Sequence, residues 1–256
     1  MTEDNNILEK VKVLGIEKVI PSIYEDGIKP ATQELGKGLV IVAKTINLAL
    51  SPLSGLVWGY EKIQEYVVSS LSKKFENIPA ERIVTPKAII VGPLLESLRY
   101  AGNEEHLREM FINLLATSMD KKHIQNAHPA FVEIIKQLCP SEAALIKHIA
   151  TNYPLYQFCS VHSDNDGYYP FEILKDEFVS LVSKSNIQNP ELALTYLDNF
   201  IRLKLIEMQN ASTDQNIEKY QPRFDPDRVM YSFNQLWYED LSFSSFGVQF
   251  VKACVL

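Results

Sequence analysis

The sequence predicts a mainly α-helical protein: an N-terminal helical bundle followed by a winged-helix-like α+β module with a small antiparallel sheet. Up to Lys204, apolar residues recur at the three- and four-residue spacing of amphipathic helices. After Lys204 the apolar residues alternate or follow no period, which favours short strands. The order expected in the second half is helix, helix, helix, strand, loop, strand, which fits a winged helix. We therefore expect two domains, residues 1–138 and 139–256.

The composition is that of a folded protein with an acidic surface. The chain has 256 residues, of which 46% are apolar and 22% charged, and its net charge is -7. Residues 1–133 carry 15 Lys and Arg against 17 Asp and Glu, and residues 134–256 carry 10 against 15. Because nucleic-acid binding depends on a basic face, DNA or RNA is not the expected partner. Three separated cysteines without a CxxC pair, and an acidic N-terminus, favour a reducing cytoplasm.

Prolines and apolar spacing define the helices expected in the first half. They cover residues 6–20, 30–50, 52–74, 86–100 and 104–119. Pro21 ends the first helix, since proline cannot continue a helix interior, and Gly92-Pro93 is expected to kink the fourth. The fifth is the clearest, because its apolar residues form a core-facing stripe, with Asn103 as the expected N-cap. The stripe consists of Leu107, Met110, Phe111, Leu114 and Leu115.

The second half is expected to begin with helices and to end with strands. Helices are predicted from His128-Pro129 to residue 138, over 142–151 with Ser141 as the cap, over 171–185 and over 190–204. Residues 152–170 are rich in Tyr, Asp, Asn, Ser and Gly and are expected to be irregular. Strands are predicted at 205–209, 229–233 and 241–243, and Gly247 is expected in a turn before a last helix at 248–254.

Metal sites are not indicated by the spacing of the candidate ligands. His106, His123 and His128 lack the HExxH or HxH spacing of zinc ligands, and His128 is interpreted as a helix-start residue before Pro129. The run Asp164-Asn165-Asp166-Gly167 is similar to part of a calcium loop. It lacks the rest of the twelve-residue pattern, so a solvated turn is expected.

Catalytic groups are also missing from the sequence pattern. Cys139 has no base beside it and is interpreted as a structural thiol. No phosphate-binding glycine loop and no GxSxG motif occurs, and Arg108 and Asn113 are the two residues weighed for a polar site. We therefore expect no catalytic, cofactor-binding or metal-binding residue, no cofactor, and a protein that is not an enzyme.

The apolar stretch 39–58 has two interpretations. It contains a single charge, Lys44, and approaches the ~20 residues needed to span a bilayer. Asn47, Ser51-Pro52 and Ser54-Gly55 interrupt it, which favours two buried helices of a bundle. Insertion of this stretch into a membrane remains the alternative.

Residues 101–150 resemble the core signature of the abortive-infection alpha family. The resemblance rests on "LREMFINLLATSMD", a short linker and "HPAFVEIIKQL", and "LSPLSGLVWGYEKI", "IPAERIVTPKAIIVGPLLESLRY" and "SFGVQFVKAC" also match the family style. It extends from about Pro30 to Cys254. The residues that carry it most sharply are Leu107, Phe111, Leu114, Leu115, His128, Pro129, Phe131 and Ile135.

The resemblance implies a role in bacterial defence against phage, by abortive infection, and brings no catalytic residue with it. We expect a non-enzymatic cytoplasmic protein that acts through protein–protein interaction. Two alternatives are a membrane-acting effector that uses residues 39–58 and a winged-helix DNA-binding regulator. The oligomeric state and the identity of the protein partner do not follow from the sequence.

Overall fold

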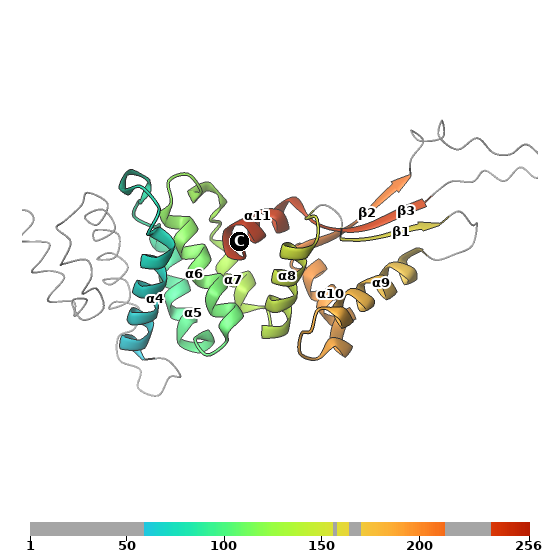
Figure 1. Cartoon of the computed structure of the whole chain (residues 1–256), viewed down its shortest axis with the longest axis horizontal. Coiled ribbons are helices and arrows are strands. Elements are labelled where there is room, and N and C mark those ends of the chain that lie inside the picture. Colours follow the sequence, from blue (N-terminus) through green and yellow to red (C-terminus); the bar gives the residue numbers. More distant parts are fainter. Residues whose placement is uncertain (1–58, 156–157, 164–169, 213–236) are drawn as a thin grey trace, which may run out of the picture. The chain divides into compact units, whose positions relative to one another are not determined.

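A computed structural model of the chain defines residues 59–155, 158–163, 170–212 and 237–256 (Figure 1). The helices expected at 6–20 and 30–50, the strand at 229–233, the run 164–167 and the apolar stretch 39–58 lie outside these ranges. Within them the protein is mainly helical, with a small antiparallel sheet, as the sequence predicts.

The chain divides into two compact units. Unit 1 is Met1–Ala143 together with Gln249–Leu256, and unit 2 is Ala144–Val248. The C-terminal residues, which we expected in the second domain, therefore belong to unit 1. Inside unit 1, the amide group of Asn113 donates to the carbonyl oxygens of Cys254 and Val255, at 3.0 and 3.3 Å. These bonds join the C-terminal end of the chain to a helix more than a hundred residues earlier.

Unit 1 is built from helices that lie side by side in Figure 1. Its elements are α4 (Tyr60–Phe75), η2 (Ala80–Arg82), α5 (Ala88–Ala101), α6 (Glu105–Met119), η3 (Ile124–Asn126) and α7 (Ala130–Lys136). Each helix buries one apolar face, and the fully buried side chains include Phe111 and Phe131. Phe131 packs edge-on against Phe250 of the C-terminal segment, with ring centroids 5.3 Å apart. This packing places the C-terminal segment in the core of unit 1.

Two helix starts differ from the sequence-based expectation. The residue before α6 is Glu104, which makes no side-chain cap hydrogen bond, so the prediction that Asn103 is the N-cap is wrong by one residue. Helix α8 (Pro140–Asn152) begins at Pro140, ahead of the Ser141 that we expected to cap it. The carboxylate of Glu142 accepts the backbone N–H of Cys139 at 2.7 Å, which is one half of a capping box.

Unit 2 combines helices with a three-stranded antiparallel sheet. Its elements are the rest of α8, β1 (Cys159–Ser163), α9 (Pro170–Lys184), η4 (Pro190–Leu192), α10 (Ala193–Arg202), β2 (Ile206–Ser212) and β3 (Trp237–Phe243). Strand β3 lies between β1 and β2, and α9 packs against β1 and β3 (Figure 1). The strands predicted at 205–209 and 241–243 are therefore confirmed. The prediction that 152–170 is irregular throughout is wrong, because β1 lies within it.

Helix α10 ends in a Schellman motif that directs the chain into β2. The N–H of Leu205 donates to the carbonyl of Phe200, and the N–H of Lys204 donates to that of Ile201, both at 2.9 Å. Lys204 has a φ of 57°, the left-handed conformation that this motif requires at C′, the first residue beyond the C-cap. Phe200 and Leu205 are both fully buried, which supplies the apolar contact that accompanies the motif.

Helix α11 (Ser245–Cys254) begins earlier than predicted, and Gly247 lies inside it. The prediction that Gly247 marks a turn before the helix is therefore wrong. The hydroxyl of Ser244 accepts the N–H of Gly247 at 2.9 Å and donates to the carbonyl of Lys204, so it caps the helix. A Cβ on Gly247 would overlap the carbonyl oxygen of Leu205. Glycine is needed here because the helix approaches the backbone of the chain entering β2.

Candidate functional site

The three histidines weighed as metal ligands have separate environments. The Nδ1 atom of His128 accepts the N–H of Ala130 at 3.1 Å, as its interpretation as a helix-start residue predicts. The Nε2 atom of His123 lies 3.9 Å from a carboxylate oxygen of Asp120, and Nδ1 of His106 is enclosed without a hydrogen-bond partner. In the described ranges no group of three or more His, Cys, Asp or Glu residues could hold a metal ion.

Asp120 forms a part-buried ion pair with Arg82. The Nε atom of Arg82 donates to Oδ1 at 3.1 Å, and its Nη2 donates to Oδ2. The N–H of Lys122 adds a further bond to Oδ1 at 3.0 Å. Burial alone would raise the pKa of Asp120, but these hydrogen bonds and the charges of Arg82 and His123 together hold it below its ordinary value. The Arg82–Asp120 ion pair joins η2 to the end of α6, so its burial is explained by a structural role.

Arg108 and Asn113, the residues weighed for a polar site, make different contacts. The guanidinium of Arg108 lies over the ring of Tyr66, 4.9 Å from its centroid, and its Nη1 donates to the carbonyl of Gly102 at 2.9 Å. The amide of Asn113 binds the last carbonyls of α11, and the hydroxyl of Thr117 donates to that of Ala253 at 3.0 Å. Asn113 thus satisfies orphan carbonyls at a helix C-terminus.

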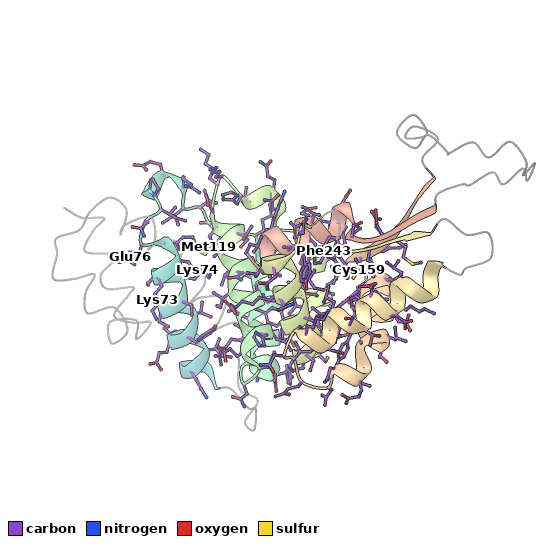
Figure 2. The ribbon with its side chains drawn as sticks, turned by 45° about the vertical axis from the view of Figure 1, so that its right-hand side comes forward. Lys73, Lys74, Glu76, Met119, Cys159 and Phe243 are labelled. Atoms are coloured by element: carbon purple, nitrogen blue, oxygen red, sulfur yellow. The ribbon has the colours of Figure 1, made fainter. Side chains whose placement is uncertain are left out.

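The cysteines do not have the environment of reactive thiols. Burial raises the pKa of Cys139, and burial with the charge of Glu177 raises the pKa of Cys159 to about 12. Cys254 is fully buried and its pKa is also raised. Cys159 lies on β1, where it pairs with Leu241 of β3, and its side chain is labelled in Figure 2. Because the thiolate is the nucleophile, these shifts favour the structural interpretation given to Cys139.

The most distinctive surface of unit 2 is the exposed side of η4 and α10. Leu192 on η4 and Leu194 on α10 are each 43% exposed, whereas Tyr196, Leu197 and Phe200 of α10 are buried. Glu191 on η4 and Asp198 on α10 are also exposed, three residues before and four residues after Leu194. We call Glu191, Leu192, Leu194 and Asp198 the α10 face.

The loop before this face is fixed to the helix. The hydroxyl of Tyr196 is within hydrogen-bond distance of the carbonyl of Asn189, at 3.1 Å. Asn189 has a φ of 55° and precedes Pro190, so the entry into η4 is set by the backbone as well as by this bond. The α10 face is therefore held on rigid elements, which suits a binding surface.

The charged residues described in unit 2 are mainly acidic. Arg202, the cation at the end of the helix, donates twice to the side-chain oxygen of Asn199, at 3.0 and 2.6 Å. The described residues of unit 2 contain five Lys and Arg against eight Asp and Glu, a net charge of -3. The exposure of Leu192 and Leu194 could not be predicted from the sequence.

The described helices contain none that is long and apolar enough to cross a membrane. The stretch 39–58, on which the membrane alternative depends, lies outside the described residues.

Comparison with known proteins identifies a family for the chain. The profile of the family described as abortive infection alpha matches residues 59–254, more than three quarters of the sequence. Neither the curated proteins nor the solved structures contain a match. The match spans residues of both compact units and includes the runs "LREMFINLLATSMD" and "HPAFVEIIKQL", but it begins at residue 59, whereas the resemblance was expected from about Pro30. The chain therefore belongs to the abortive infection alpha family.

Proposed function

We propose that this chain is a non-enzymatic, cytoplasmic component of bacterial abortive-infection defence that acts by binding another protein through the α10 face. Membership of the family suggests the abortive-infection role. The exposure of Leu192 and Leu194 on a rigid, acidic helix face is the observation that carries the binding function. Solvent exposure of two large apolar side chains costs free energy, and burial in an interface would recover it.

The order of elements in unit 2 supports a winged-helix-like module. One helix, a strand, two helices and two further strands follow each other along the chain, and the last strand lies between the other two. In this arrangement α10 takes the position that contacts duplex DNA in DNA-binding winged helices. The exposed carboxylates of Glu191, on η4 just before α10, and of Asp198, on α10, would lie near phosphates there. We therefore prefer a protein partner to the DNA-binding alternative.

The test measures the plating efficiency of phage on a bacterial host. This host carries the gene together with its native neighbouring genes, and wild type is compared with a variant. We expect wild type to lower plating and Leu192→Glu/Leu194→Glu to restore it at least ~10-fold, because two added charges would have to be desolvated in the interface. Both leucines are exposed, so the variant is expected to keep the wild-type Tm.

A matched control changes two other exposed apolar residues to Glu. Ile89 on α5 and Met208 on β2 are 64% and 42% exposed, so Ile89→Glu/Met208→Glu adds the same charge at similar sites. This control is expected to protect like wild type. If Leu192→Glu/Leu194→Glu protects as fully as wild type, the α10 face is not the binding surface. If the wild-type gene does not lower the plating of any phage tested, the defence role is wrong.

A further inference from the structure

Backbone hydrogen bonds bring two connecting segments together at one end of unit 1. The N–H of Lys121, just after α6, donates to the carbonyl of Arg82 in η2 at 2.7 Å, beside an antiparallel bridge between the same two segments. Two further backbone bonds fold the chain between the last turn of α4 and Arg82 into successive tight turns (Figure 2). We call residues 73–87 and 120–126 the η2 end of unit 1.

The η2 end carries an excess of exposed positive charge. Its five lysines are all exposed, and they are Lys73, Lys74, Lys87, Lys121 and Lys122. Among the residues that the structure describes, none of these lysines forms an ion pair, whereas Arg82 is neutralised by Asp120. Glu76 and Glu81 are the exposed carboxylates of this end. Six Lys and Arg against three Asp and Glu give the η2 end a net charge of +3.

The rest of unit 1 has the opposite charge. Its described residues outside the η2 end contain five Lys and Arg against eight Asp and Glu, a net charge of -3. Three of these acids, Glu61, Glu104 and Glu105, lie at the starts of α4 and α6, whereas the η2 end contains the last residues of these helices. The charge is therefore separated along the helices, which would turn the η2 end toward an anionic surface.

Helix ends add little opposing potential at the η2 end. Helices α4 and α6 finish there, and a helix C-terminus is negative because its last carbonyls are unpaired. At the end of α6, however, the carbonyls of Thr117 and Met119 accept the N–H groups of Asp120 and Val84, at 3.4 and 2.8 Å. Helix α5 begins at the same end, and its N-terminus is positive. The exposed lysines therefore determine the sign of the potential.

We propose that the η2 end binds the surface of a membrane that contains anionic phospholipids. Clusters of about four to eight Lys and Arg are typical of proteins that adsorb to such membranes. Lysine is a point charge on a flexible chain, which suits an array of headgroups without fixed geometry. Pro79 is exposed and Ile78 and Val84 are half-buried between the lysines, so they can add apolar contact at the level of the headgroups.

Nucleic acid fits the η2 end less well than a membrane. No Phe, Tyr or Trp is exposed within residues 73–87 and 120–126, so no such ring is present for bases to stack on. Arg82 is the single arginine of these segments, and its guanidinium is engaged by Asp120. The proposed membrane surface lies in unit 1 and is independent of the binding function proposed for the α10 face.

The test is co-sedimentation of the full chain with lipid vesicles. One set contains about 30% phosphatidylglycerol in phosphatidylcholine, and the other set contains phosphatidylcholine alone. In about 0.1 M sodium chloride, wild type is expected to bind the anionic vesicles at least ~10-fold more tightly than the neutral ones. In about 0.5 M sodium chloride, this binding is expected to weaken at least ~10-fold, because salt screens exposed charges.

Lys121→Gln/Lys122→Gln is expected to weaken binding to the anionic vesicles about 30-fold, since each lysine near such a surface adds to the affinity. The contacts of this turn use backbone groups of the two lysines, so the variant is expected to keep the wild-type Tm. Lys73→Gln/Lys74→Gln changes the other segment of the η2 end and is expected to weaken binding to a similar extent.

Lys62→Gln/Lys184→Gln is the matched control, because it removes two exposed lysines that lie at the start of α4 and at the end of α9. It is expected to bind the anionic vesicles like wild type. The proposal is overturned if wild type binds both kinds of vesicle equally, if the control loses as much affinity as the other variants, or if duplex DNA binds more tightly than the anionic vesicles. Binding that persists in high salt and in both η2-end variants would also overturn it, and would indicate insertion of residues 39–58 instead.

Discussion

The carboxylate of Asp120 holds together two segments that are distant in sequence. Its backbone carbonyl accepts the N–H groups of His123 and Ile124, at 2.8 and 2.7 Å, while its side chain binds Arg82 and the N–H of Lys122. The N–H of Lys121 also donates to the carbonyl of Arg82 at 2.7 Å. A single residue thus ends α6 and attaches the following turn to η2. The sequence placed Asp120 at the end of a signature run but gave no sign of its partner 38 residues away.

The Asp120 pair predicts a specific dependence of stability on pH. Because the pKa of Asp120 is lowered in the folded protein, its contribution to stability is complete above the unfolded-state pKa, about 3.9. It is lost as the pH falls below that value and passes through the folded-state pKa. Asp120→Asn is therefore expected to lower the free energy of unfolding by about 1–3 kcal/mol at pH 7, and by less near pH 3. Urea unfolding of wild type and Asp120→Asn at pH 7 and at pH 3 measures the difference in the free energy of unfolding at each pH.

Glu133→Gln is the control for this prediction. Glu133 pairs with Lys136 at 3.0 Å, and both side chains are about half exposed, so the change is expected to cost less than about 0.5 kcal/mol. The structural role of Asp120 would be refuted by equal stabilities of wild type and Asp120→Asn at pH 7.

Among the elements, α11 needs a glycine at position 247, because its first turn lies against the backbone of Leu205. Its N-terminal turn is attached to the start of β2 by Ser244, whose N–H donates to the carbonyl of Leu205 at 3.0 Å. The backbone of Gly247 lies so close to the same carbonyl oxygen that a Cβ at this position would overlap it. Sequence patterns treat a glycine near a helix start as a turn signal, because they carry no information on what lies beside it. That is why the boundary of this helix was misplaced.

Two glycine substitutions test this account of α11. Gly247→Ala is expected to destabilise the protein by about 2–3 kcal/mol, since its Cβ would force the helix away from Leu205. Gly92→Ala, inside α5, is expected to stabilise by about 0.5–1 kcal/mol, because nothing lies within 4 Å of its Cβ position. Chemical denaturation of both variants gives the comparison. A Gly247→Ala protein as stable as Gly92→Ala would contradict the close approach.

Helices with a clear apolar stripe were the elements that the sequence predicted best. The helices expected at 86–100, 104–119 and 171–185 correspond to α5, α6 and α9. The spacing of their apolar residues marks the face of each helix that is buried, and burial of that face is what stabilises the helix. Strand β1 was missed because its residues, Cys-Ser-Val-His-Ser, are short and mostly polar. It is a strand because β3 supplies its hydrogen bonds, and a pairing between distant segments leaves little local signal.

For the whole molecule, the sequence predicted the helical class and the family, and both are confirmed. It could not predict that residues 249–256 return to unit 1, because the bonds of Asn113 and Thr117 to the last carbonyls join segments far apart. Nor could it predict the surface that we propose as a binding surface. Leucine is a residue type typical of a protein core, so the sequence gave no sign that Leu192 and Leu194 are exposed.

Site-specific photocrosslinking from position 194 in phage-infected cells tests the central claim most directly. A benzophenone side chain at Leu194 is expected to form one discrete adduct with another protein. The same side chain at Met208, which is equally exposed, is expected to form none. The adduct at position 194 should also be lost when Asp198→Lys reverses the charge beside it. Equal adducts from both positions, or adducts with nucleic acid alone, would contradict a protein-binding function of the α10 face.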